Sequence, residues 1–390
     1  MKTLYLLTSD YPYATREAFL ETEIKFLCEQ FQRVEIIPME GLGTKARPVP
    51  GNCVVWEPIR NTRHYEWTHC FSFWFLPYAI KEFFKSKAYA NRRRIKNFLI
   101  ICVHINNYLN SPRMKKLLKK VSSDDVFYSY WGRLGNSIAP FLYGKVKYVS
   151  RFHGDGDLWG QVCEDNGAFR DKVISSLDLA AIISEKGRDY FVSRYNCKKV
   201  IISRLGTVNH GCISSRSTDG IIRVVSCSVV RPLKRVDLIY KSLQLFEEDI
   251  EWTHIGDGES FEELQNMVKS AKPNIKVILT GSMTNSEVLH YYENHNFDVF
   301  VNVSTNEGVP VSIMEAISYN IPAVATNVGA TSEVVTPKSG VLVSENPSAK
   351  EIKDAIVKAV ASGLEPRSFW EERFNAEKNY QQWAKILWEL

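Results

Sequence analysis

The fold is decided by the stretch Val301-Asn-Val-Ser-Thr-Asn-Glu307-Gly-Val-Pro310-Val-Ser-Ile-Met-Glu315-Ala-Ile317. Its apolar start reads as a buried strand that ends near Val303, and Pro310 suits the first position of a helix. The loop between them carries Glu307 and Gly308. A strand, a short loop and a helix in this order form the repeating unit of parallel α/β sheets.

The same unit recurs along most of the chain, where short apolar runs alternate with helix-length segments such as 17–30 and 235–246. Strands are predicted at 3–7, 34–38, 126–130, 147–152, 179–184, 199–203, 222–227, 251–255, 275–280, 299–303, 323–326 and 340–343. Two series of about six strands predict an α/β protein with two doubly wound, Rossmann-like domains. A single (β/α)8 barrel is the competing fold, but it has too few strands.

The length of 390 residues also favours two domains, because one hydrophobic core rarely grows beyond about 250–300 residues. The polar, irregular segment 205–220 predicts a surface linker. We therefore expect a first domain at 1–203 and a second at 221–365. The aromatic segment 369–390 is predicted to be a helix that packs back on the first domain.

The positive charge of the chain is concentrated in one stretch. Lys and Arg number 49 against 44 Asp and Glu, yet residues 83–123 hold eleven basic residues and no acidic one. This stretch follows the aromatic run 71–80, and it contains what we call the basic patch, Arg92, Arg93, Arg94 and Lys96. Aromatic and basic residues side by side suit an anionic membrane surface. A solvated helix face is the alternative, and nucleic acid is not favoured because no RNA- or DNA-binding module is visible.

Cysteine usage and hydropathy bear on the compartment. The eight cysteines show no C-x-x-C spacing, which argues against a disulfide framework or a zinc ribbon and fits a reducing compartment. No apolar run approaches the ~20 residues of a membrane-spanning helix. We expect a cytoplasmic protein, peripheral on the inner face of the cytoplasmic membrane.

The opening stretch also suggests chemistry. The free N–H groups at the start of its helix predict an anion site at 308–313, where Gly308 allows close approach of a phosphate. Glu315, about one and a half turns into the helix, can accept both hydroxyls of a ribose, and Glu307 can accept sugar hydroxyls beyond the phosphates. The alternative is two exposed glutamates at a helix start, where acids are common.

The spacing Glu307-x7-Glu315 resembles the E-x7-E signature of the family-4 retaining glycosyltransferases of the GT-B fold, of the bacterial surface-polysaccharide type. Further matches to that family follow in order along the second half: Ser226-Cys-Ser-Val-Val-Arg-Pro-Leu-Lys234-Arg-Val-Asp237, Ile255-Gly-Asp-Gly258, Leu279-Thr-Gly281 and Thr326-Asn-Val-Gly329-Ala-Thr-Ser-Glu333. The first half matches at Asp10-Tyr-Pro-Tyr13, Glu17-x-Phe-Leu-Glu21, Arg151-Phe-His153-Gly154 and Ser184-Glu-Lys-Gly187. The resemblance covers nearly the whole chain.

The resemblance implies two Rossmann-like domains that face each other across a cleft, the first on the acceptor side and the second binding the donor. It implies retaining transfer of a hexose-type sugar from a nucleotide diphosphate-sugar to a hydroxyl of a glycan acceptor, lipid-linked, in the biosynthesis of O-antigen, capsule or another surface polysaccharide. The nucleotide-sugar is a co-substrate, and neither a cofactor nor a metal is expected.

Residue roles follow from the same resemblance. Glu315 matches the carboxylate that holds the ribose, and Lys234 matches the lysine that neutralises the donor diphosphate. Glu307 and His153 match residues that contact the donor sugar near the reacting centre, and we name these two as catalytic. Further donor contacts are predicted at Gly308, Val309, Pro310, Val311, Ser282 and Met283.

The chain departs from the family pattern at Val229, where an arginine is usual, and Arg231 is the predicted substitute. Arg204 and Arg16 are candidates for a phosphate or acceptor contact. Asp155-Gly-Asp157 resembles the metal-binding triplet of a different glycosyltransferase fold, but Asp157 is better read as a helix cap or cleft residue. Two other functions stay open: a sugar-nucleotide epimerase of the same fold, and a non-catalytic partner subunit.

Overall fold

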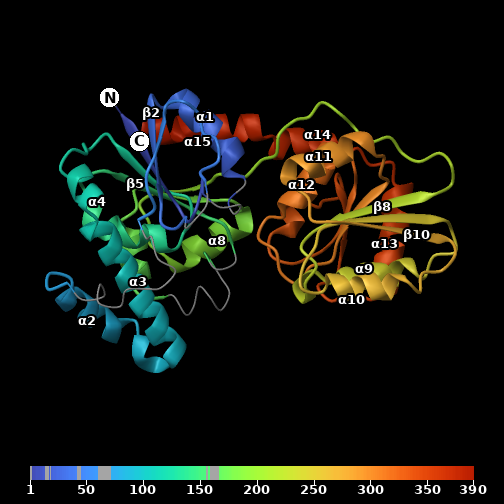
Figure 1. Cartoon of the computed structure of the whole chain (residues 1–390), viewed down its shortest axis with the longest axis horizontal. Helices are drawn as coiled ribbons and strands as arrows, with labels where there is room; N and C mark the ends of the chain where they lie inside the picture. Colours follow the sequence, from blue (N-terminus) through green and yellow to red (C-terminus); the bar gives the residue numbers. More distant parts are fainter. Residues whose placement is uncertain are drawn as a thin grey trace. The chain divides into compact units, whose positions relative to one another are not determined.

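The computed structural model describes residues 2–13, 17, 19–41, 45–59, 72–154, 157–158 and 167–390. The chain forms two compact units (Figure 1). The first unit comprises Met1–Arg204 together with Tyr380–Leu390, and the second comprises Leu205–Asn379. The division on the C-terminal side falls within one helix, α15 (Ala376–Glu389).

The described part of the first unit contains a parallel sheet of seven strands in the order β3-β2-β1-β4-β5-β6-β7. Their bounds are β1 Thr3–Thr8, β2 Arg33–Pro38, β3 Cys53–Val55, β4 Val126–Ser129, β5 Lys147–Phe152, β6 Leu179–Ile182 and β7 Val200–Ile202. The order reverses between β1 and β4, so the loops after these two strands diverge there. In open α/β sheets such a switch point is where ligands bind.

Helices cover both faces of this sheet, and alternate residues of a strand therefore enter different cores. On β1, Leu4 and Leu6 pack with α1 and α15, whereas Tyr5 and Leu7 pack with the helices of the other face. The helices of the first unit are α1 Leu20–Gln30, α2 Leu76–Lys85, α3 Arg92–Asn110, α4 Pro112–Leu117, α5 Ala139–Leu142, α7 Arg170–Ser175 and α8 Glu185–Arg194, with short 3₁₀ turns η2 Ala88–Ala90 and η3 Leu134–Ile138. Figure 1 shows α15 running beside α1.

A buried ion pair holds the α1 face together. Arg151 on β5 is fully buried, and its guanidinium donates to Glu23 of α1 and, at 2.8 Å, to the Ser203 hydroxyl. The ring of Trp383, from α15, lies 4.8 Å from the guanidinium carbon. The charge is thus surrounded by a carboxylate, a hydroxyl and an aromatic face, which offsets its removal from water.

The second unit contains a parallel sheet of six strands in the order β10-β9-β8-β11-β12-β13, within the described residues. The strands are β8 Ile222–Cys227, β9 Ile250–Ile255, β10 Ile275–Gly281, β11 Val299–Asn302, β12 Ala323–Thr326 and β13 Gly340–Val343. The helices are α9 Val236–Leu243, α10 Phe261–Val268, α11 Asn285–Asn294, α12 Val311–Ser318, α13 Ala349–Ala361 and α14 Pro366–Arg373, with turns η4 Pro232–Lys234 and η5 Thr331–Glu333. In Figure 1, α9, α10 and α13 cover one face and α11, α12 and α14 the other.

Each of the predicted strands is present, within one or two residues of its predicted ends. β3 was not predicted, because its apolar run is short and the strand has only three residues at the edge of the sheet, where it pairs with β2 through Val34 and Cys53. Pro310 is the N-cap of α12, so the helix begins at Val311, one residue later than predicted.

Two predictions about the domain boundaries are corrected. The segment 369–390 is two helices, α14 and α15, because the chain between them pairs with Thr207, whose N–H donates to the Phe374 carbonyl at 2.9 Å. Asn375 then caps α15 by accepting from the Glu377 N–H. The predicted linker 205–220 belongs to the second unit. The Ser214 N–H donates to the Tyr319 carbonyl, and the Ser217 hydroxyl donates to the Asp298 carboxylate.

The buried ion pair gives a stability prediction. Glu23→Gln leaves Arg151 buried without a carboxylate, so we expect the free energy of unfolding to fall by about 3–5 kcal/mol. Denaturation followed by tryptophan fluorescence measures this loss. Asp189→Asn is the matched control, because Asp189 pairs with Arg188 at the surface of the same unit, and a change of less than about 1 kcal/mol is expected there. Equal losses in the two variants would contradict the prediction.

Candidate functional site

The switch point of the second sheet lies between β8 and β11. The loop after β8 leads through η4 to Lys234, and the loop after β11 carries Glu307. Because both strands end at the same edge of the sheet, their loops bring these two residues together. The Lys234 Nζ atom lies 2.6 Å from Glu307 Oε1.

The Lys234–Glu307 ion pair is mostly withdrawn from solvent, with 18% and 13% of the two side chains exposed. Asn302, the last residue of β11, donates to the same carboxylate oxygen at 3.2 Å. The pair thus places one positive and one negative charge side by side where a parallel sheet commonly binds its ligand.

Two neighbours fix the loop that carries Glu307. Gly329 has a φ of +55°, and a Cβ on it would lie 1.7 Å from the Glu307 carbonyl oxygen, so only glycine fits there. Arg235 donates to the carbonyls of Val303 at 2.6 Å and Ser304 at 3.1 Å. Both Gly329 and Arg235 stand in motifs of the sequence analysis, but no role was predicted for Arg235, because its contacts join distant loops.

The start of α12 faces this loop. Gly308 and Val311 are partly buried, and Val309 and Pro310 are buried. No side chain among the described residues caps the first turn of α12. The positive end of the helix dipole lies at this turn, although the Ile313 N–H already donates to the Pro310 carbonyl at 3.2 Å. The anion site at 308–313 stays a prediction.

Glu315 lies on the buried side of α12. Its Oε1 accepts from the Asn285 side-chain amide of α11 at 2.7 Å. Burial raises the pKa of Glu315 to about 7, and the bond from Asn285 only partly opposes this. The Cys227 thiol at the end of β8 has its pKa raised to about 12 by burial and by Glu315, while Lys234 opposes the rise. Glu315 and Lys234 therefore both lie close enough to the Cys227 thiol to change its pKa, in opposite directions.

The remaining predicted donor contacts lie further out. Ser282 and Met283 follow β10 and line a depression of about 650 Å³ along α11, together with His290 and Tyr291. Two residues later, Asn285 reaches Glu315, which connects this segment to the carboxylate. Arg231 is exposed at the N-cap of η4, and Val229 is exposed beside it.

His153 belongs to the first unit, directly after β5. Its Nε2 lies 2.9 Å from the Tyr130 carbonyl, which can only accept, so Nε2 carries the proton and Nδ1 is an acceptor. Burial, and secondarily the charges of Arg151 and Arg133, lower the pKa of His153 well below its usual value. The ring centroid lies 4.5 Å from that of Trp131. His153 is therefore a neutral side chain at neutral pH.

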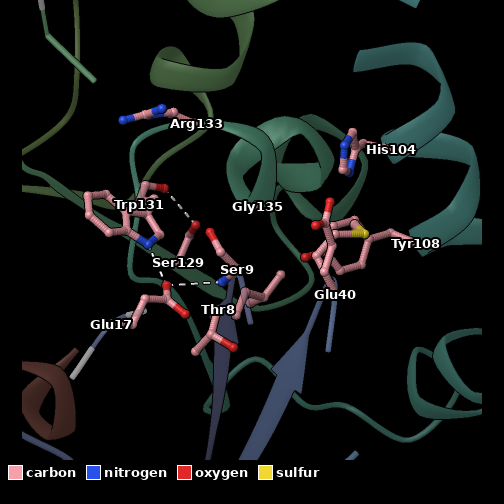
Figure 2. A pocket seen from close by; sticks show the side chains of 12 residues that line it. Thr8, Ser9, Glu17, Glu40, His104, Tyr108, Ser129, Trp131, Arg133 and Gly135 are labelled. Carbon is pink, nitrogen blue, oxygen red and sulfur yellow. Dashed lines mark hydrogen bonds between the residues drawn. The ribbon is translucent and has the colours of Figure 1, made fainter. Parts of the chain in front are cut away.

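A cavity at the switch point of the first sheet was not predicted. It measures about 330 Å³ and lies beyond the ends of β1, β2 and β4 (Figure 2). Its polar lining includes Ser9, Glu40 and His104, and its aromatic lining Tyr108 and Trp131. We call it the polar cavity. Its signal was available, because Glu40 and Trp131 come just after predicted strands.

Glu17 organises one wall of the polar cavity. Its carboxylate accepts from the N–H groups of Ser9, Asp10 and Tyr11 at 3.1, 3.0 and 2.8 Å, and from the indole of Trp131. The resemblance included Glu17 in a motif, and the structure gives this residue a positioning role.

The loop after β4, Trp131–Gly135, also lines the polar cavity, and its Trp131 lies beside Glu17. A Cβ on Gly132 would lie 2.2 Å from the Phe152 ring, so the loop packs directly against the end of β5. Arg133 donates from Nε to the buried carboxylate of Asp157 at 2.9 Å. That carboxylate also accepts from the N–H groups of Gly132 and His153, so Asp157 joins two loops. The segment that Asp157 was predicted to cap lies largely outside the described residues.

The remaining candidates for a phosphate, acceptor or metal contact are Arg204, Arg16 and Asp155. Arg204 is paired with Glu185 within the first unit. Arg16 and Asp155 lie outside the described residues. Among the described residues, no group of three or more His, Cys, Asp or Glu side chains is arranged to hold a metal ion.

The basic patch lies at the start of α3, where Arg92, Arg93 and Lys96 are exposed and Arg94 is partly buried. Large apolar side chains are exposed on the preceding residues, including Phe73 at 96% and Phe84 at 64%. In the described part of the chain, no helix is both long and apolar enough to span a membrane.

Comparison with known proteins places the donor-side motifs in a family. Residues 215–382 match the family described as "Glycosyl transferases group 1". The amylovoran biosynthesis glycosyltransferase AmsK of Erwinia amylovora is 23% identical, over 73% of this chain and 76% of AmsK. The O-antigen biosynthesis glycosyltransferase WclY of Escherichia coli is 24% identical, over 63% of this chain and 67% of WclY.

Solved structures agree on the fold. Anabaena HepE, solved in complex with UDP, superposes with a TM-score of 0.67 over 100% of both chains at 14% identity. Together with the two Rossmann-like units, this likeness shows that the fold is GT-B, as the sequence predicts.

The raised pKa of Glu315 gives a pH prediction. Folding favours its protonated form, so this contribution to stability is complete below the ordinary pKa of 4.5 and is lost as the pH rises to about 7. Glu315→Gln cannot ionise, so we expect its free energy of unfolding to gain about 3 kcal/mol relative to the wild type between pH 4 and pH 8. Denaturant titrations at several pH values measure the difference.

The exposed Glu262 of α10 offers a control for that series, since Glu262→Gln should follow the wild type at every pH. A difference between Glu315→Gln and the wild type that does not change with pH would contradict the assignment.

Proposed function

We propose that this chain, a glycosyltransferase whose residues 215–382 are a group 1 domain, moves a hexose-type sugar from a nucleotide diphosphate-sugar to a hydroxyl of a glycan acceptor. The acceptor is lipid-linked, and the product enters a surface polysaccharide. The names of AmsK and WclY, which refer to amylovoran and O-antigen biosynthesis, support this role.

One observation carries the donor site: Lys234, Glu307 and the uncapped start of α12 meet at the switch point of the second sheet. A diphosphate needs positive charge and N–H donors, and a sugar needs a carboxylate that accepts from its hydroxyls. The site offers both within one hydrogen-bonded group. The UDP in HepE supports a nucleotide diphosphate as the ligand class.

In this proposal Lys234 changes partner. Without donor it pairs with Glu307, and with donor it binds the diphosphate, whose negative charge is greater than that of one carboxylate. The exchange releases Glu307 to accept hydroxyls of the sugar. As the bond from the anomeric carbon to the diphosphate breaks, Lys234 and the N–H groups of α12 stabilise the charge that grows on the leaving group, without a metal ion.

Glu315 holds the ribose in this scheme. Two ribose hydroxyls donate best to an ionised carboxylate, so nucleotide binding releases the proton that Glu315 retains when its pKa is about 7. Asn285 keeps the carboxylate oriented for this contact. Nucleotide affinity therefore depends on pH near neutrality.

The transfer proceeds with retention. The acceptor oxygen attacks the anomeric carbon on the face from which the diphosphate leaves, and the proton of the acceptor hydroxyl passes to a leaving phosphate oxygen. The products are a glycoside and a nucleoside diphosphate. His153 is the catalytic candidate of the first unit, since it is neutral and its Nδ1 can accept from a sugar hydroxyl.

The basic patch holds the enzyme at an anionic membrane surface, where a lipid-linked acceptor resides. Exposed Arg and Lys side chains supply the attraction, and the exposed Phe73 and Phe84 side chains supply apolar area that can enter the lipid boundary.

Variants of the ion pair test the donor site. We expect Lys234→Ala to weaken nucleoside diphosphate binding by about tenfold or more, since it removes a charge-assisted contact. Glu307→Gln should bind the nucleoside diphosphate at least as tightly as the wild type, because Lys234 loses its competing partner, yet transfer no sugar. Titration calorimetry and a coupled nucleoside diphosphate-release assay measure the two effects.

The exposed residues Lys338 and Glu345 of the same unit provide matched controls, and Lys338→Ala and Glu345→Gln should behave as wild type. Full transfer by both Lys234→Ala and Glu307→Gln would overturn the site.

Liposome flotation tests the membrane surface. Vesicles with anionic lipid should recover the protein, and neutralising Arg92, Arg93, Arg94 and Lys96 together should release most of it, since each charge contributes about 1 kcal/mol. The control neutralises Lys115, Lys116, Lys119 and Lys120, which are exposed and equal in charge but follow α3. Equal release by both sets would refute the patch.

A further inference from the structure

Helix α3 lines two cavities of the first unit in succession. Its residues His104 and Tyr108 line the polar cavity, and Asn97, Ile100 and Ile101 line a second cavity of about 190 Å³. We call the latter the apolar cavity, because Phe169, Val173 and Ile174 complete its lining. From Asn97 to Tyr108 the helix rises about 16 Å, so the two cavities follow each other along it.

Arg133 is the residue that joins the two cavities, since it lines both. Its side chain is 42% exposed, and its Nε bonds the Asp157 carboxylate at 2.9 Å. A second arginine of the apolar cavity, Arg170, donates to the carbonyl of the same Asp157 and to the Tyr195 hydroxyl at 2.8 Å. Both guanidinium groups are therefore held beside one residue, Arg133 at the carboxylate of Asp157 and Arg170 at its backbone carbonyl.

Three surfaces of different chemical character follow one another along α3, and their order matches the parts of one kind of molecule. The first turn bears the basic patch, the next turns line the apolar cavity with its two arginines, and the following turns line the polar cavity with Trp131, Glu40 and His104. A sugar joined through phosphate to an apolar chain presents the same sequence of groups. An aromatic ring with carboxylate and imidazole groups suits the sugar, and arginine suits the phosphate.

We infer that the first unit binds a phosphate-linked lipid acceptor along α3, with its sugar in the polar cavity, its phosphate at Arg133 and Arg170, and the adjoining part of its chain in the apolar cavity. This inference rests on the proposed function, and it assigns the acceptor to residues that the donor site does not use. The apolar cavity is smaller than a site for a whole drug-sized ligand, so it takes only the part of the chain next to the phosphate. The rest of the chain stays in the membrane beside the basic patch.

Binding of farnesyl phosphate to the full chain tests the inference without any sugar transfer. Equilibrium dialysis below the micellar concentration should show saturable binding, with farnesol and inorganic phosphate each at least about tenfold weaker, because each lacks one of the two matched groups. Arg133→Ala and Arg170→Ala should each weaken binding by about tenfold or more. Arg188→Ala is the matched control, since Arg188 is also 42% exposed and paired with one aspartate.

A second variant leaves both arginines in place. Ala168→Leu adds volume to the lining of the apolar cavity and should weaken farnesyl phosphate binding about tenfold, whereas Val192→Leu, on exposed α8, should not. Circular dichroism and the melting temperature identify any variant that fails to fold. If the two arginine variants fail to fold, the comparison of Ala168→Leu with Val192→Leu still tests the inference.

The inference would be overturned if farnesol bound as tightly as farnesyl phosphate. It would also be overturned if Ala168→Leu and Val192→Leu bound farnesyl phosphate equally well. Nucleoside diphosphate titration of the same samples separates the two proposals. If the wild type binds a nucleoside diphosphate but shows no saturable binding of farnesyl phosphate, only the acceptor site is contradicted. If the wild type binds no nucleoside diphosphate, the proposed function is contradicted.

Discussion

The sites of this protein depend on one topological constraint: each sheet grows in both directions from its first strand. In the first unit the order reverses beside β1, and in the second beside β8. Right-handed crossovers then carry the chain to opposite faces, so the loops after the two central strands part and leave the sheet edge uncovered. The Lys234–Glu307 pair lies at one such edge and the polar cavity at the other. The strand order alone thus determines where both candidate ligand sites lie.

Charge at the donor edge is balanced within the protein. Lys234 is paired, the raised pKa of about 7 leaves Glu315 only partly ionised near neutral pH, and the start of α12 contributes only partial charges. The edge is therefore close to neutral without a ligand, although two carboxyl groups and an ammonium lie there. In the proposed function, a nucleotide diphosphate would change this balance, because it would bind the lysine and favour the ionised form of Glu315. Binding thus reorganises existing charges, and the surrounding loops, held by Gly329 and Arg235, need not move to supply them.

The sequence predicts the fold well because the buried parallel strands carry apolar runs, such as 224–225 within β8 and 299–301 within β11. It predicts Lys234, Glu307 and Glu315 because their chemistry resides in short local motifs. It misses β3, whose apolar run is too short to stand out, and the break between α14 and α15, which a contact with Thr207 determines. It also misses the two cavities of the first unit. Glu40 and Trp131 follow predicted strands and mark part of the polar cavity. The linings also combine residues of α3 and of 168–174, which no local spacing brings together.

The central claim is that this chain transfers a sugar from a nucleotide diphosphate-sugar and keeps its anomeric configuration. Proton and phosphorus NMR of the reaction with a panel of nucleotide diphosphate-sugars and a phosphate-linked glycan acceptor tests it most directly. One donor should yield a nucleoside diphosphate and a new glycosidic anomeric proton whose coupling matches that of the donor. A product of inverted coupling, or an epimerised nucleotide-sugar formed without acceptor, would contradict it.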